Sequence, residues 1–185
     1  MSMRKYLWLL MACAFTSCWK YTHNNTRNSA YTGQKVWGYK PVYATESVAK
    51  TISYLPSPQI AVSYGNIYAF RNYIFQIDPG FGIHVFDNST PLFAHKIGFI
   101  TVRGCSQISI KNDKLYTNSY DDLVVLDFSD LQNVHEYSRL KGLFIEYKYG
   151  SAISIPPGRG YYECPSYDNL VTGWVMDSVY MECYQ

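Results

Sequence analysis

The sequence has few charged residues and no marked excess of either sign. Charged residues make up 16% of the 185 residues, and the formal net charge is +2. Lysines and arginines are scattered, so no basic stripe could neutralise a phosphate backbone, and we expect no nucleic acid partner. Aromatic residues reach 17% and include 19 tyrosines, a composition that favours β-strands. An aromatic surface that stacks on sugars or peptides is the alternative interpretation of the tyrosines.

Motifs of catalysis and metal binding are missing as well. The histidines, at positions 23, 84, 95 and 135, show no HExxH spacing, and the chain has no CxxC pair and no GxSxG elbow. His84 lies within a strand pattern, where a packed or exposed strand residue is expected. Asp121, Asp122, Asp127 and Asp130 lack EF-hand spacing, and turn capping explains them more simply. We therefore expect no catalytic residue, no metal site and no cofactor.

The longest apolar run near the N-terminus is too short to cross a membrane. It covers the ten residues Tyr6–Phe15, follows Arg4 and Lys5, and suits a secretory signal, since a spanning helix needs about 20 residues. The run ends in Thr16-Ser17-Cys18, which resembles the bacterial lipobox, although Phe15 stands where that pattern prefers Leu. The resemblance implies a signal peptide at 1–17 and a lipid such as palmitate on Cys18. The alternative is an ordinary signal peptide that is cleaved elsewhere.

An exported location affects what is expected of the remaining cysteines. Cys164 and Cys183 bracket Pro165–Glu182, and an oxidising envelope favours a disulfide between them that closes a hairpin-like tail. Two reduced cysteines are the alternative. Cys105 precedes an alternating stretch and is expected to be a small buried hydrophobe.

A pattern with a period near forty occurs twice in the middle of the chain. Strand, tight turn and strand at 67–76 recur at 108–117, and the apolar strand at 83–89 recurs at 123–129. The offset is one residue larger in the first half than in the second, so one loop differs by one residue. This is the size of a propeller blade, and it predicts a mainly β fold of antiparallel repeats in a partial, propeller-like array. Coincidence between two generic hairpins is the alternative.

The units are placed at Ile60–Leu92 and Lys96–Asn133, with a third strand set beginning near Tyr137. The segments IHVFDNSTP (83–91) and LVVLDFSDLQN (123–133) resemble the LVIVD-repeat β-propeller proteins, in particular lipoproteins of the Bacteroides group. The resemblance covers about residue 35 to the C-terminus and corresponds to the N-terminal half of such proteins. It implies that Asp87 with Ser89, and Asp127 with Ser129, begin the turn after the central strand. The prolines usual in this repeat are mostly replaced here.

These patterns divide the chain into a signal peptide (1–17), a polar tether and lead-in (18–58), two repeats (59–142) and a C-terminal segment (143–185). The predicted function is that of an envelope lipoprotein, anchored in the outer membrane, which acts as a non-catalytic protein-interaction scaffold. The sequence does not assign it to the periplasmic or the surface face. Open sheet edges favour a protein partner or self-association. The alternatives are a glycan-binding surface lipoprotein and a truncated fragment of a longer propeller lipoprotein. A propeller hydrolase or lyase is a further rival that would need Asp121, Asp122 and His84 close together.

Overall fold

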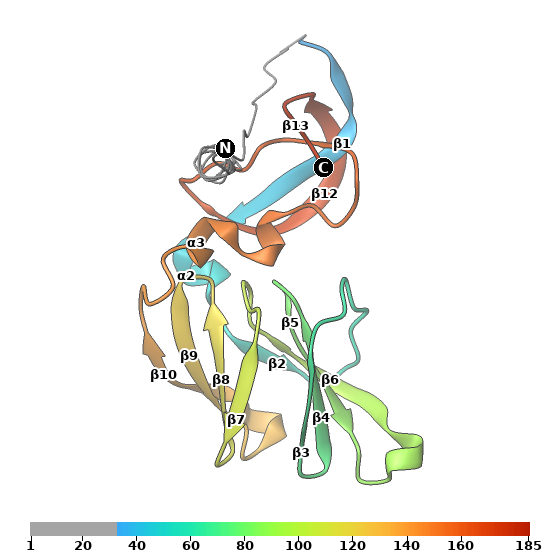
Figure 1. Ribbon diagram of the computed structural model, residues 1–185, viewed down its shortest axis with the longest axis vertical. Helices are drawn as coiled ribbons and strands as arrows, with labels where there is room; N and C mark the ends of the chain where they lie inside the picture. Colours follow the sequence, from blue (N-terminus) through green and yellow to red (C-terminus); the bar gives the residue numbers. More distant parts are fainter. Residues whose placement is uncertain (1–32) are drawn as a thin grey trace, which may run out of the picture.

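The computed structural model describes residues 33–185, which form three β-sheets (Figure 1). The first sheet has the strand order β2–β6–β5–β4–β3, and all of its paired strands are antiparallel. Its strands are β2 (Ser53–Leu55), β3 (Ile67–Phe70), β4 (Tyr73–Asp78), β5 (Gly82–Asp87) and β6 (His95–Thr101). The second sheet has the order β10–β9–β8–β7 and is also antiparallel. Its strands are β7 (Ile108–Lys111), β8 (Lys114–Ser119), β9 (Asp122–Asp127) and β10 (His135–Leu140).

The two sheets repeat one another strand by strand. β3 and β4 begin at Ile67 and Tyr73, and their equivalents β7 and β8 begin at Ile108 and Lys114. β5 and β6 begin at Gly82 and His95, and their equivalents β9 and β10 begin at Asp122 and His135, an offset smaller by one residue. The short 3-10 helices η2 (Pro91–Phe93) and η3 (Leu131–Asn133) keep this second offset. The mainly β, antiparallel repeat array predicted from the sequence is therefore present, and the single-residue difference lies between β4 and β5.

The limits of each repeat differ from the sequence-based assignment. β6 closes the first sheet by pairing with β5, although its residues were assigned to the second unit. β10 likewise pairs with β9 and completes the second sheet, so the strand near Tyr137 does not begin a third set. A short connection such as 88–94 favours pairing between consecutive strands, which explains why each fourth strand joins the sheet before it.

The hydrophobic core lies between these two sheets, which stand side by side in the lower half of Figure 1. Each sheet contributes one face, because side chains alternate along a strand. Phe75 and Phe128 meet edge to face at the centre, with ring centroids 5.2 Å apart. The other fully buried members are Ile77, Ile83, Val85, Ile100, Val102, Cys105, Leu115, Val124 and Leu126.

A third sheet, in the upper half of Figure 1, joins the two ends of the described chain. β1 (Lys35–Ala44) pairs antiparallel with β12 (Leu170–Tyr180), from Lys35 opposite Tyr180 to Ala44 opposite Leu170. The short strands β11 (Tyr161–Tyr162) and β13 (Cys183–Tyr184) extend it. The helical turns α2 (Glu46–Ala49), α3 (Tyr147–Gly150) and η4 (Ala152–Ser154) lie between this sheet and the repeats.

This sheet changes two expectations. Part of the segment 18–58, expected as tether and lead-in, forms β1, α2 and β2. The C-terminal segment is not a hairpin that turns near Gly173, because β12 continues through that residue and pairs with β1 along its length. In both segments the partner strand lies far away in the sequence, so local patterns could not reveal the pairing.

Candidate interaction site

The second sheet leaves one of its two faces uncovered by the core. Leu115, Val124 and Leu126 point toward the first sheet, so the alternate residues Tyr116, Leu123 and Val125 point away from it. Register places Ser109 beside Tyr116, and Leu140 beside Leu123, on that same side. We call this the outer face of the second sheet. Its middle is apolar, with Tyr116 36% exposed and Leu140 56% exposed, whereas Lys111 and the ion pair of Lys114 with Asp127 lie toward one end of the same face.

The segment after β10 extends this apolar surface. Leu143 and Ile145 are 49% and 74% exposed, and Tyr137 on β10 is 64% exposed. Monomeric soluble proteins rarely expose contiguous apolar patches of this kind unless a partner or ligand covers them. This surface is therefore a candidate for binding.

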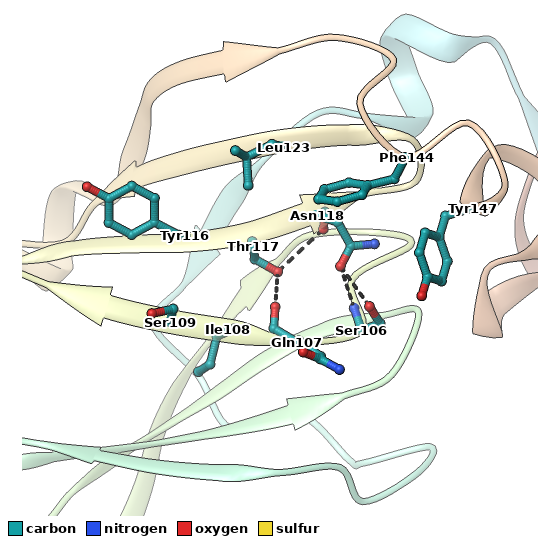
Figure 2. Close-up of a pocket in the computed structure, with 10 residues that line it drawn as sticks. All are labelled: Ser106, Gln107, Ile108, Ser109, Tyr116, Thr117, Asn118, Leu123, Phe144 and Tyr147. Atoms are coloured by element: carbon teal, nitrogen blue, oxygen red, sulfur yellow. Dashed lines mark hydrogen bonds between the residues drawn. The ribbon is translucent and has the colours of Figure 1, made fainter.

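A hollow of about 280 Å³ lies where the outer face meets this segment (Figure 2). Phe144 and Tyr147 form one wall, with ring centroids 6.1 Å apart in an edge-to-face arrangement, and Tyr116 lies on the other side. The complete lining is Ser106, Gln107, Ile108, Ser109, Tyr116, Thr117, Asn118, Leu123, Phe144 and Tyr147. None of these side chains is charged, so the hollow suits a neutral or apolar group.

The buried polar groups of the hollow already bond to one another. The Ser106 amide donates to Asn118 Oδ1 at 2.9 Å, and Asn118 Nδ2 donates to the Gly104 carbonyl at 2.8 Å. Thr117 Oγ1 donates to the Gln107 carbonyl at 2.7 Å. These bonds hold the approach to β7 against β8 and leave the aromatic rings, with Gln107 and Ser109, as the groups that can contact a partner.

The Asp-x-Ser elements act as turn caps. Asp87 Oδ1 accepts the Ser89 amide at 2.7 Å, and Asp127 Oδ1 accepts the Ser129 amide at 2.9 Å. Hydrogen bonds from Ser89 lower the pKa of Asp87. The Lys114 ammonium, followed by the Ser129 amide, holds the pKa of Asp127 well below its usual range. Both pairs stabilise the turn after a central strand, and neither lies in the lining of the hollow.

Turn capping, the interpretation from sequence, describes only part of the role of Asp121 and Asp122, since Asp122 accepts the Gly142 amide at 3.0 Å but both residues also form buried ion pairs. Both are buried, and the Lys50 ammonium lies 2.6 Å from Asp121 and 3.0 Å from Asp122. Arg139 also contacts Asp122, at 2.8 Å. Burial alone would raise the pKa of Asp122, but hydrogen bonds from Arg139 and Gly142 outweigh it and lower that pKa. Sequence reasoning missed this cluster because Lys50 and Asp121 are 71 residues apart.

His84 is completely buried in the first sheet, and its contacts differ from those of the two aspartates. Its Nε2 lies 3.4 Å from Asp78 Oδ2, and its ring packs on Phe99. Within residues 33–185 neither ring nitrogen has a hydrogen-bond partner. Asp78 accepts the amides of Val62 and Ser63, which fixes the loop before β3. His84 is thus a packed strand residue, and the fold does not bring it together with Asp121 and Asp122.

Of the cysteines in residues 33–185, two form a disulfide and one is buried in the core. Cys164 and Cys183 form a disulfide with their Cα atoms 5.5 Å apart, the pair that the sequence favoured. Cys105 is fully buried as expected, and burial raises its pKa to about 12. Its Sγ lies 3.4 Å from the Gly82 carbonyl oxygen. Cys18, the predicted lipid attachment site, lies outside the described residues.

Within residues 33–185, no helix is long and apolar enough to span a membrane. Nor do any three His, Cys, Asp or Glu residues of the range gather in a way that could hold a metal ion. No family model matches the chain, and no curated protein or solved structure matches it significantly. Membership of the LVIVD-repeat family therefore stays a prediction.

Proposed function

We propose that this chain is a lipid-anchored, non-catalytic β-repeat scaffold of the bacterial cell envelope that binds a protein through the outer face of the second sheet. The observation that carries the proposal is the uncovered apolar surface formed by that face and the segment 143–147. When a protein covers a surface rich in tyrosine and leucine, apolar area is removed from water, which favours association. Tyrosines are also enriched in protein interfaces.

The membrane anchor rests on the sequence alone. The apolar run Tyr6–Phe15 followed by Cys18 supports export and lipidation. A lipid chain contributes about 0.8 kcal/mol for each buried CH₂, so two or more acyl chains hold a protein on a membrane stably. Metabolic labelling with an alkyne analogue of palmitate tests this: the wild-type chain should be labelled, and Cys18→Ser should be neither labelled nor retained in the membrane fraction.

Photo-crosslinking in intact cells tests the protein-binding role. Tyr116 is replaced by p-benzoyl-phenylalanine, and Tyr167, which is 71% exposed near the third sheet, receives the same replacement as a matched control. We expect a discrete protein adduct, identified by mass spectrometry, from position 116 and none from position 167. Leu140→Asp, a change at an exposed site on the same face, should remove the adduct. Equal adducts from both positions, or none from position 116, would contradict the proposal.

The hollow favours a second candidate function, the binding of a neutral glycan. Tyr116, Phe144 and Tyr147 supply aromatic rings, and Gln107 and Ser109 supply polar groups without charge. Titration calorimetry with maltotriose, cellotriose and N-acetylchitotriose tests this function. Binding that is lost in Tyr147→Ala but kept in Tyr167→Ala would favour glycan recognition, and the absence of binding to all three would remove it.

A further inference from the structure

The internal repeat relates the uncovered face of the second sheet to a covered face of the first. When β4 and β5 are aligned with β8 and β9, Phe75, Ile83 and Val85 correspond to Tyr116, Leu123 and Val125. Ile100 corresponds in the same way to Leu140. The first set is buried in the core, whereas the second forms the outer face of the second sheet. In their central part the two faces are thus alike, one covered and the other uncovered, whereas Phe70 and Tyr73 at one end correspond to Lys111 and Lys114.

The covered example shows what packs on such a face. Phe75, Ile83 and Val85 pack against the opposite face of the following sheet, which presents Leu115, Val124 and Leu126. At the centre, Phe128 meets Phe75 with ring centroids 5.2 Å apart and Phe70 at 5.7 Å. The partner for this kind of face is thus the opposite face of another repeat sheet.

The first sheet carries a face of that second kind, which no other repeat sheet covers within residues 33–185. Its residues equivalent to Leu115, Val124 and Leu126 are Ile74, His84 and Phe86, and register places Ile67 on the same side. The loop 56–66 lies over the part near His84, held by the bonds of Val62 and Ser63 to Asp78. The surface beside the loop is open, with Ile67 62% exposed. We call this surface the outer face of the first sheet.

One cation, Lys96, lies on this outer face, where its ammonium stands over the Phe86 ring and donates to the Gln59 carbonyl at 3.0 Å, and the loop beside it carries no charge. No charged residue and no histidine occurs from Thr51 to Phe70, a segment that contains β2, the loop and β3. Ile60 and Tyr64 of the loop are nonetheless 95% and 76% exposed. This uncharged, exposed and apolar segment matches the uncharged hollow beside the outer face of the second sheet, because a contact between the segment and the hollow buries no charge.

We infer that the outer face of the second sheet binds the outer face of the first sheet of a second copy of this chain, in a head-to-tail arrangement. The inference rests on the proposed function and names its partner. Outside the part that the loop 56–66 covers, the association would reproduce between chains the packing already present within one chain. A contact between two different faces is the heterologous kind that builds rings or extended assemblies.

The internal packing predicts which residues meet across the contact. Phe75 corresponds to Tyr116, and Phe128 corresponds to Asn88, which is only partly buried in the single chain. Tyr116 of one copy should therefore lie close to Asn88 of the other. Two full-length chains with different tags, one carrying Tyr116→Cys and the other Asn88→Cys, are coexpressed, and their membranes are treated with a short bismaleimide. The buried Cys105 and the bonded Cys164 and Cys183 contribute little background, which the unsubstituted chain measures.

We expect a product that joins the two tags at a yield at least tenfold above that from Tyr116→Cys with Tyr167→Cys. Leu140→Asp in the first chain should return the yield to the control level, while its circular dichroism stays unchanged because Leu140 is 56% exposed. If the tenfold difference is missing but position 116 still forms a photo-adduct with another protein, the second copy is not the partner and the proposed function survives. If both signals are missing, both proposals fail. A dominant product between two Tyr116→Cys chains would also overturn the head-to-tail contact.

Discussion

The ammonium of Lys50 lies 2.6 Å from the carboxylate of Asp121, and both side chains are buried, at 7% and 10% exposure. Lys50 follows α2, directly after β1 of the third sheet, whereas Asp121 precedes β9 of the second sheet. Arg139 on β10 extends the contact through Asp122 and through a bond from its Nη2 to the Lys50 carbonyl, 3.0 Å long. This ion cluster therefore ties the third sheet to the repeats.

Replacing Lys50 should lower the free energy of unfolding of the chain. Lys50→Met leaves Asp121 buried without its cation, and breaking a buried pair in this way costs about 3–5 kcal/mol. Lys40→Met is the matched control, because its pair with Asp177 is nearly half exposed and solvent screening leaves it little effect on stability. Urea unfolding followed by tryptophan fluorescence measures both variants. Equal free energies of unfolding for the two variants would show that the buried cluster contributes no more to stability than the exposed ion pair.

Gly104 should tolerate no side chain. Its φ is +78°, and a Cβ there would lie 2.4 Å from the Tyr120 backbone nitrogen. Gly142 has a similar φ of +64° but nothing within 4 Å of the same position. Gly142→Ala should therefore lower the free energy of unfolding by about 1–2 kcal/mol, because alanine disfavours a left-handed backbone, whereas Gly104→Ala should lower it clearly more. Comparable midpoints of thermal unfolding in the two variants would show that the close approach to Tyr120 is not rigid.

The sequence predicted those parts of the fold that depend on neighbouring residues. The turns at Arg71 and at Asn112-Asp113 have positive φ, and the strands that lead into them, β3 and β7, alternate in burial, so both hairpins could be predicted from neighbouring residues. The pairing of β1 with β12 could not be predicted in this way, because neither strand shows a regular alternation of burial and the partners are far apart in the chain. The same holds for the hollow, since Phe144 and Tyr147 follow the last repeat strand in a segment without periodicity. The outer face itself could have been found by applying the repeat offset to Phe75 and Val85.

The stability of the chain should fall between neutral and mildly acidic pH because of His84. Burial, assisted by the Lys96 ammonium, lowers the pKa of His84 below the value of about 6.5 expected in the unfolded chain, although Asp78 opposes the shift. In the window between the two pKa values the unfolded chain binds the proton and the folded chain does not. Stability is therefore complete above about pH 6.5 and is lost as the pH falls, by up to about 1.4 kcal/mol per pH unit.

Urea unfolding between pH 7.5 and pH 5.5 tests the role of His84. His84→Leu should remove most of the decrease in this range, because the new side chain does not titrate. His95→Gln is the control, since His95 is exposed and its replacement should leave the decrease intact. A decrease of the same size in His84→Leu and in the wild-type chain would assign it to other groups.

The disulfide should account for much of the order in the C-terminal segment. Cys164 and Cys183 are 19 residues apart, and closing a loop of this size in the unfolded chain contributes about 3 kcal/mol. The strands beside the bond are short: β11 and β13 have two residues each, with Tyr161 opposite Tyr184 and Tyr162 opposite Cys183. Cys164→Ser and Cys183→Ser should therefore destabilise the chain equally, and the double variant should be no less stable than either single variant. Adding a reductant should bring the wild-type chain down to the level of the variants and leave the double variant unchanged, because Cys105 is buried and unpaired. If the reductant also destabilised the double variant, a bond other than Cys164–Cys183 would have to be responsible.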